Sequence, residues 1–270
     1  MKSFVGSRIK KILMHSNIGH PFFTDFKVDP ALDWQMSRAE KYAIINLLTH
    51  LKPNVSIEIG TFKGGSLQVI DAFSQEVYSI DISSAPKEFL SEKFNKVHFL
   101  VGESHVLVSQ LLKDLDQQGK SVDFVLIDGD HTTAAVKRDI LSVLNHPHKK
   151  KVHIILHDSF NPQCRKGIST IDYKRFPHVK LVELDYIGGS YWHNDTYREM
   201  WGGFALIVID PTHNNGVEIT ASLQHMQKSL FWRSVHLFKD PLQFLVPFKQ
   251  RLYRKLGIKQ RIEMYEHFGE

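Results

Sequence analysis

Two aspartates, Asp128 and Asp158, stand at the ends of hydrophobic runs. Asp128 closes the run VDFVLID, and Asp158 directly follows KVHIILH. If both runs are parallel strands of one sheet, the carboxylates meet at one edge and repel each other unless a cation or a basic side chain lies between them. Hard divalent cations prefer oxygen ligands, and two histidines, His131 and His157, stand beside the aspartates in the sequence. These residues predict a cation site or an acid–base site, with turn capping by the aspartates as the alternative.

A second group of residues surrounds a glycine-rich turn in the stretch SIEIGTFKGGSL. A β-branched run ends at Gly60, and a helical pattern begins at Ser66. Glycines at a strand-to-helix turn let a ligand approach the backbone, and the helix N-terminus offers free N–H groups. The spacing matches neither G-x-G-x-x-G nor the Gly-Lys-Ser/Thr of a P-loop, which disfavours an NAD-type oxidoreductase.

An acid, Asp81, ends the strand-like run that follows this turn, 23 residues after Glu58. Ligands of doubly wound sheets bind at the carboxyl ends of the strands, beside the first strand. A carboxylate at that position can accept both hydroxyl groups of a ribose. The turn and Asp81 therefore predict a site for a nucleoside-containing ligand.

The elements that position these residues alternate between strand and helix. Strand-like runs are predicted at 54–60, 76–82, 96–102, 122–128, 151–157, 179–187 and 203–210, and helices at 35–51, 64–74, 87–94, 104–118, 132–146 and 163–175. This order predicts an α/β fold with three layers: a doubly wound, mostly parallel, seven-stranded sheet with helices on both faces. A polar loop separates the last two runs, which predicts an antiparallel hairpin at the sheet edge.

Composition and charge indicate one globular domain with two extensions. The 270 residues are 42% hydrophobic, and we predict an N-terminal arm at 1–34, the domain at 35–211 and a basic extension at 212–270. The residues from 228 to 261 include nine Lys or Arg and one acid, so the net charge of +5 arises in the extension, and nucleic acid is not an expected partner. A single cysteine and the lack of a long apolar segment predict a cytoplasmic location.

Over residues 35–210 the sequence resembles the class I S-adenosylmethionine-dependent methyltransferases. Their first motif reads roughly E-x-G-x-x-x-G-x-S, and VDFVLIDGDHTTAAVKRDI together with IILHDSF is similar to the branch of macrocin and catechol O-methyltransferases. The resemblance implies a Rossmann-like methyltransferase fold and S-adenosyl-L-methionine as cofactor. It places the cofactor against Glu58, Gly60, Gly64, Gly65, Ser66, Asp81, Gly102, Ser104 and Asp128.

The same resemblance assigns the chemistry to the strand-end residues. It implies O-methylation of a small or sugar-containing hydroxyl acceptor, with His131 and Asp128 as catalytic residues and Asp128, His157 and Asp158 as ligands of a divalent cation such as Mg²⁺. The related enzymes have an oxygen donor where His157 stands, and imidazole suits zinc, nickel, copper or iron better than magnesium.

Two segments have more than one interpretation. The loop 188–203 carries tyrosines, tryptophans and short polar residues that suit a sugar or phenol acceptor, or else forms an ordinary hairpin. Residues 229–262 interleave aromatic and basic side chains, which predicts peripheral membrane contact, packing on the domain, or a homodimer contact. The alternative for the whole protein is a non-catalytic S-adenosylmethionine-binding or docking protein.

Overall fold

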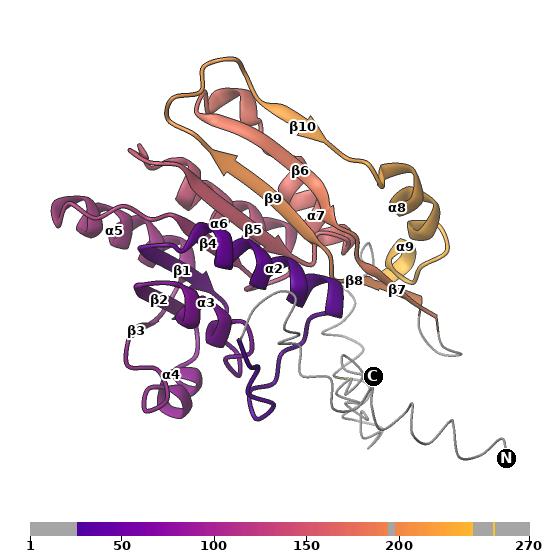
Figure 1. The fold of residues 1–270 in the computed structure, drawn as a ribbon. Coiled ribbons are helices and arrows are strands. Elements are labelled where there is room, and N and C mark those ends of the chain that lie inside the picture. Colours follow the sequence, from indigo (N-terminus) through magenta and orange to yellow (C-terminus); the bar gives the residue numbers. More distant parts are fainter. Residues whose placement is uncertain (1–25, 194–197, 240–250, 252–270) are drawn as a thin grey trace, which may run out of the picture.

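The computed structural model describes residues 26–193, 198–239 and 251 (Figure 1). The strands are β1 (Val55–Ile59), β2 (Glu76–Asp81), β3 (Val97–Val101), β4 (Phe124–Ile127), β5 (Val152–His157), β6 (Val179–Ile187), β7 (Ser190–His193), β8 (Arg198–Trp201), β9 (Phe204–Ile209) and β10 (Glu218–Thr220). The helices are α2 (Arg38–Leu51), α3 (Leu67–Phe73), α4 (Ala85–Leu90), α5 (Ser104–Gln117), α6 (Thr133–Leu144), α7 (Pro162–Ser169), α8 (Gln224–Phe231) and α9 (His236–Lys239), with a 3₁₀ turn at Tyr173–Arg175.

Eight of these strands form one twisted sheet in the order β10-β6-β9-β5-β4-β1-β2-β3. Strands β1 to β5 are parallel, and β9 runs antiparallel between β5 and β6. The predicted α/β fold and antiparallel hairpin are confirmed. Two details of the prediction are wrong: the sheet has eight strands instead of seven, and the short strand β10, parallel to β6, lies outside the hairpin and forms the edge. Only three residues long, β10 is too short to leave a clear alternation in the sequence.

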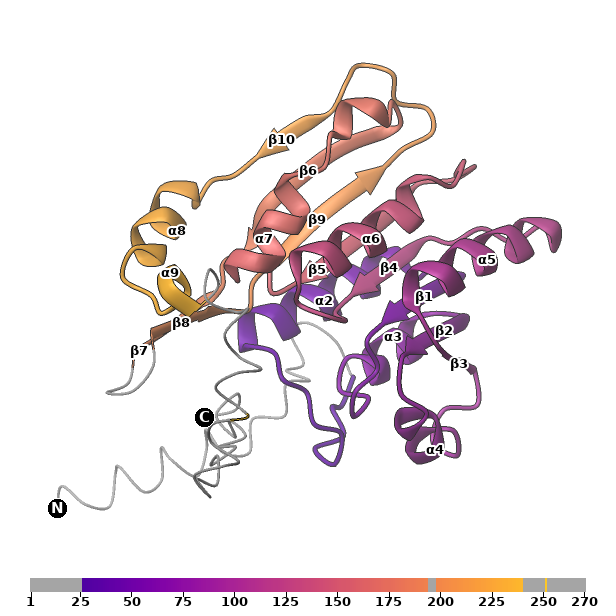
Figure 2. The same ribbon diagram turned by 180° about the vertical axis from the view of Figure 1, so that it is seen from behind.

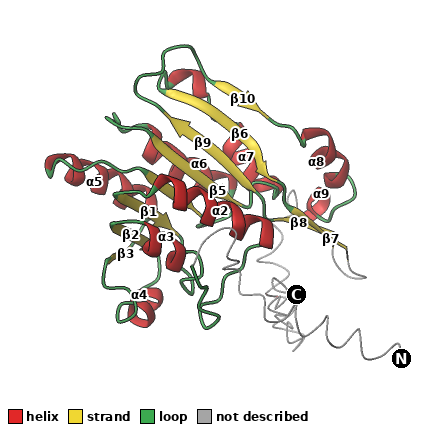
Figure 3. Ribbon diagram, in the orientation of Figure 1, coloured by secondary structure: helices red, strands yellow, loops and turns green. Residues whose placement is uncertain are grey.

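Helices cover both faces of the sheet, so the fold has the three predicted layers. Helices α2 and α3 pack on one face (Figure 1), and α5, α6 and α7 pack on the other (Figure 2). Two separate hydrophobic clusters fill the two interfaces: one includes Ile45 and Ile70, the other Leu111 and Ile140. The central strands of the sheet lie between the two sets of helices, whereas β7 and β8 lie outside this sheet (Figure 3). The central strands β1, β4 and β9 are buried along their whole length, which explains their continuous apolar sequences.

The carboxyl ends of the parallel strands meet where the predicted chemistry lies. The turn after β1 is fixed between its neighbours, because Gly60 N donates to Ile80 O at 2.9 Å and Asp128 N donates to Ile59 O at 2.8 Å. A Cβ on Gly60 would lie 2.0 Å from the carbonyl oxygen of Asp128, and Gly60 has a φ of 90°. The close approach of these two strand ends therefore requires a glycine at Gly60, whether or not a ligand is bound.

A small ribbon of β7 and β8 replaces the loop predicted at 188–203. The two strands pair antiparallel beyond the ends of β6 and β9 (Figure 1), as in the hairpin alternative. The segment after β10 lies against this ribbon: Val235 N donates to Arg198 O at 2.9 Å, and Met200 N donates to His236 Nε2 at 3.2 Å. Residues 194–197, which include some of the predicted acceptor-binding side chains, lie outside the described residues.

A buried ion pair ties α8 to the sheet. Arg165 donates from both terminal nitrogens to Asp185, at 2.6 Å and 3.2 Å, and also to Gln224 Oε1 at 2.8 Å. Residues 224–239 thus pack on the domain. Most of the predicted 229–262 segment lies outside the described residues, so membrane contact and dimerisation stay predictions. Among the described residues no helix combines the length and apolarity needed to cross a bilayer.

Helix α7 begins shortly after Asp158, and one side chain caps its N-terminus. Asn161 is buried, and its Oδ1 accepts from Gln163 N at 2.9 Å and Cys164 N at 3.5 Å. Asn161→Ala removes this N-cap and is expected to lower the free energy of unfolding by about 1 kcal/mol. Urea denaturation measures this; a variant as stable as the wild type would show that the cap contributes nothing.

Candidate active site

A cavity of about 960 Å³ opens at the carboxyl edge of the sheet. It runs from the turns after β2 and β3, past the glycine-rich turn, to the ends of β4 and β5 and to strand β8. Of the predicted site residues, those that line it are Gly60, Gly65, Ser66, Asp81, Gly102, Ser104, Asp128, His131, His157 and Asp158. Glu58 and Gly64 do not line it. The topology thus brings ten of the twelve predicted residues around one space.

Glu58 lies behind the cavity wall. It is completely buried, and it accepts hydrogen bonds from Ser66 Oγ and Ser79 Oγ, both at 2.6 Å. Burial, with only hydroxyl donors to offset it, raises the pKa of Glu58 to about 8. Its carboxyl group holds the glycine-rich turn to β2 from behind the cavity wall, and the predicted cofactor contact of Glu58 stays a prediction.

Gly64 and Gly65 also have structural tasks. Gly64 has a φ of 80°, and a Cβ there would meet the side chain of Leu90 at 3.0 Å, away from the cavity. A Cβ on Gly65 would lie 2.4 Å from both the carbonyl oxygen of Asp33 and the Cα of Trp34. Because Trp34 and Asp33 themselves line the cavity, Gly65 lets the N-terminal segment close over the turn.

Asp81 stands at the end of β2, as predicted. One carboxylate oxygen accepts from Thr61 N at 3.1 Å and Phe62 N at 3.3 Å, and the other accepts from Ser83 N at 2.9 Å. These donors fix the orientation of the carboxylate at the cavity wall. The remaining lone pairs of its oxygens are available to hydroxyl groups of a ligand.

The turn after β3 forms the opposite end of the cavity. Ser104 is the first residue of α5, and its hydroxyl donates to Asp139 Oδ1 at 2.5 Å. Asp139, on α6, is buried and lines the cavity. Burial raises the pKa of Asp139 above its ordinary value. The sequence analysis missed this acid because it lies inside an amphipathic helix and not at a strand end.

The strand-end aspartates are separated by a histidine. His131 Nε2 lies 2.8 Å from Asp158 Oδ2 and 3.7 Å from Asp128 Oδ1. Burial alone would lower the pKa of His131, but its contacts with the two aspartates raise it to about 10. Likewise, burial would raise the pKa of Asp158, but the charges of His157 and His131 lower it to about 2. The charges of the two aspartates thus favour the protonated form of His131, and its predicted role as a general base stays a prediction.

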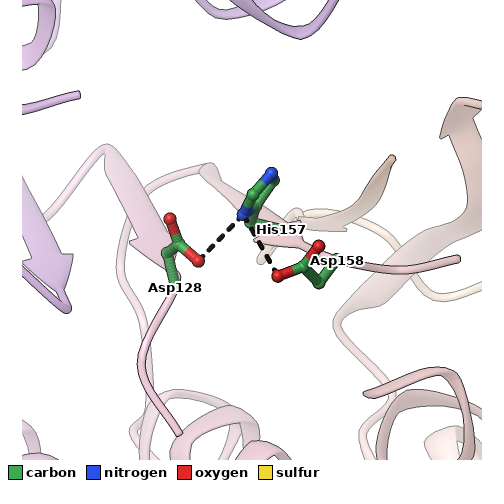
Figure 4. A group of neighbouring side chains, drawn as sticks. All are labelled: Asp128, His157 and Asp158. Carbon is green, nitrogen blue, oxygen red and sulfur yellow. Dashed lines mark hydrogen bonds and ion pairs between the residues drawn. The ribbon is translucent and has the colours of Figure 1, made fainter. Parts of the chain in front are cut away.

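His157 lies between the same aspartates on the sheet side (Figure 4). Its Nδ1 is 2.9 Å from Asp128 Oδ1 and 3.6 Å from Asp158 Oδ2. Its Nε2 points away from them toward Glu40 Oε1, at 3.3 Å. Burial would lower the pKa of His157, but the negative charges of Asp128 and Asp158 raise it well above the ordinary value.

Glu40 is a site residue that the sequence analysis missed. It lies on α2 with 1% of its surface exposed, and burial alone would raise its pKa, but the contact with His157 lowers it. The pattern Ser37-x-x-Glu40 is a capping box, so the sequence signals a helix N-terminus there but not a contact with β5.

The donor set fits one divalent cation. One ligand atom each from Asp128, His157 and Asp158 lies within 4.8 Å of the other two. Two carboxylate oxygens and an imidazole nitrogen suit a divalent metal of borderline softness. The predicted ligands are therefore brought together, and cation binding by them stays a prediction.

The wall beyond this cluster is aromatic. Trp201, on β8, lines the cavity, with its ring edge-on to that of His131 at 5.6 Å between centroids. Trp201 Nε1 donates to Glu199 Oε2 at 2.8 Å, and Glu199 also lines the cavity. Asp130, which follows β4, also lines the cavity, and its Oδ1 accepts from Thr132 N at 2.9 Å just before α6.

A family profile described as a methyltransferase domain matches residues 57–159, the part of the chain from β1 to the end of β5. This range contains the glycine-rich turn, Asp81 and the strand-end cluster. No curated protein matches the sequence.

Several solved structures are similar to this chain at low sequence identity. An O-methyltransferase from Bacillus cereus in complex with SAH is 13% identical, with a TM-score of 0.44 over 76% of this chain and 89% of that one. The O-methyltransferase TomG from Streptomyces achromogenes, in complex with SAM, is 13% identical, with a TM-score of 0.46 over 76% and 95%. Cofactor-bound Rv0187 from MTB is 17% identical, with a TM-score of 0.43 over 62% and 78%. Likenesses at these values assign no substrate to the present chain.

Proposed function

We propose that this chain, whose residues 57–159 match a methyltransferase-domain profile, is an S-adenosylmethionine-dependent O-methyltransferase that acts on a hydroxyl group of a small or sugar-containing acceptor. One observation carries the proposal. A single cavity extends from Asp81 and Ser104, at the end that suits a nucleoside, to the cluster of Asp128, His131 and Asp158. At about 960 Å³ the cavity has room for a cofactor and a second, small molecule.

The cavity residues divide into those beside the methyl donor and those beside the methyl acceptor. Asp81 accepts ribose hydroxyls, and the turn from Gly60 to Ser66 holds the methionine part of the cofactor. Trp201 offers an aromatic face to a sugar ring or a phenol on the acceptor side. Transfer then forms an O–CH₃ bond as the S–CH₃ bond breaks, and it depends mainly on alignment of the two partners.

The proton of the acceptor hydroxyl leaves toward the cluster. A divalent cation held by Asp128, His157 and Asp158 would polarise the acceptor oxygen and neutralise the aspartates. His131 is held as a cation by those aspartates, so it accepts a proton at Nε2 only when their charge is compensated.

Transfer of a labelled methyl group tests this proposal. The purified protein is incubated with S-adenosyl-[methyl-³H]methionine and a panel of catechols, phenols, sugars and glycosides, and we expect label in a methyl ether of one acceptor class. Tight cofactor binding with no transfer to any hydroxyl would instead support the non-catalytic alternative.

A further inference from the structure

Glu40 joins three parts of the chain that are far apart in the sequence. Its Oε2 accepts from Ser37 N at the start of α2, and its Oε1 accepts from Gly203 N between β8 and β9. The same Oε1 lies 3.3 Å from Nε2 of His157 at the end of β5. A Cβ on Gly202 would approach Oε1 to 2.9 Å, so a glycine leaves room for this carboxylate.

This contact orients the ring of His157, with Nε2 toward Glu40 and Nδ1 toward the strand-end aspartates. A ring nitrogen that faces a buried carboxylate carries a hydrogen, because two lone pairs would otherwise oppose each other. Both ring nitrogens of His157 face carboxylates: Nε2 faces Glu40, and Nδ1 faces Asp128 and Asp158, at 2.9 Å and 3.6 Å (Figure 4). A cation between the two aspartates would displace the hydrogen on Nδ1, while Glu40 keeps the hydrogen on Nε2. Histidines that bind metals commonly direct their second N–H toward a carboxylate. Here the contact is an ion pair of 3.3 Å between Nε2 and Glu40 Oε1, without the alignment of a hydrogen bond.

We propose that Glu40 is the positioning residue that presents His157 Nδ1 to a divalent cation between Asp128 and Asp158, and that this nitrogen makes the site select a transition-metal cation over Mg²⁺. The inference rests on the proposed function, since it assigns the cation of that same site. Mg²⁺ prefers oxygen ligands and near-ideal octahedral geometry, whereas imidazole favours the later first-row metals. The described structure offers an oxygen from each aspartate and a nitrogen from His157.

Cation titrations of the full chain, stripped of metal and saturated with S-adenosylhomocysteine, test the assignment. Co²⁺ is the probe, because its visible absorption reports a nitrogen ligand, and Mg²⁺ is titrated in parallel by calorimetry. We expect the wild type to bind Co²⁺ more tightly than Mg²⁺, and Glu40→Gln to weaken Co²⁺ binding about 10–100-fold. In His157→Asp we expect a smaller difference between the affinities for Co²⁺ and Mg²⁺, and a changed absorption spectrum of the bound Co²⁺.

Ser37→Ala is the matched control for the helix cap. It removes the hydroxyl that accepts from Glu40 N at 3.3 Å but leaves the Glu40 carboxylate beside His157, so Co²⁺ affinity should stay near that of the wild type. His157→Asp leaves Glu40 in place. It is the variant that tests the preference for Co²⁺ if Glu40→Gln does not fold.

Three outcomes overturn the assignment of Glu40: no Co²⁺ binding, equal affinity for Mg²⁺ and Co²⁺ in the wild type, or Co²⁺ affinity unchanged in a folded Glu40→Gln protein. Binding of S-adenosylhomocysteine is measured separately in excess chelator. Absence of that binding would overturn the proposed function, whereas a failed cation titration alone overturns only this inference.

Discussion

Asp158→Asn is expected to lower the rate of methyl transfer about 10²–10³-fold, the size of effect seen when one charge-stabilising group is removed from an active site. Asp158 faces His131 Nε2 at 2.8 Å, and its other oxygen accepts from Gly202 N. The amide keeps the size of the side chain and an acceptor for Gly202, but it removes the charge. Asp158 has a φ of 55°, a conformation that asparagine tolerates well, so the fold should persist.

Single-turnover rates with a methyl acceptor, together with titration of S-adenosylhomocysteine, measure this effect. Cofactor affinity should change little, because Asp158 lies at the proposed acceptor end of the cavity. Asp172→Asn, which changes an exposed carboxylate that does not line the cavity, is the matched control and should transfer at nearly the wild-type rate. Wild-type transfer by Asp158→Asn would exclude the strand-end cluster from the reaction.

Asp81→Ala should weaken binding of S-adenosylhomocysteine by about 2–4 kcal/mol, because two hydroxyl hydrogen bonds to a charged acceptor are lost. The carboxylate is already oriented by Thr61 N, Phe62 N and Ser83 N, so a ribose would meet a prearranged acceptor. Calorimetry gives the affinity, and thermal unfolding shows whether the turn itself has loosened. Asp81→Asn retains part of the acceptor capacity and should lose less affinity; equal affinity in all three proteins would remove Asp81 from the cofactor site.

The sheet could be predicted from the sequence because its buried parallel strands correspond to apolar runs. Several of these runs end at a residue that lines the cavity. Asp81, Asp128 and Asp158 could be placed together for this reason, since parallel strands bring their carboxyl ends to one edge. The match of residues 57–159 to a methyltransferase domain agrees with that interpretation.

The contacts that adjust the site could not be predicted in this way. Glu40 and Gly203 are 163 positions apart, and the local pattern at Glu40 signals only a helix cap. Glu58 stands in a motif typical of cofactor binding, but it is used to hold Ser66 and Ser79. The protonation of His131 depends on two aspartates that become its neighbours only in the folded chain.

Calorimetric titration of the purified protein tests most directly whether the cavity between Asp81 and Asp158 binds S-adenosylmethionine. S-adenosylhomocysteine and NAD⁺ are titrated under the same conditions, with Asp81→Ala as the site control. The expected result is one S-adenosylhomocysteine bound per chain, with lower affinity in Asp81→Ala, and no heat from NAD⁺. Binding of NAD⁺ with none of S-adenosylhomocysteine would contradict it.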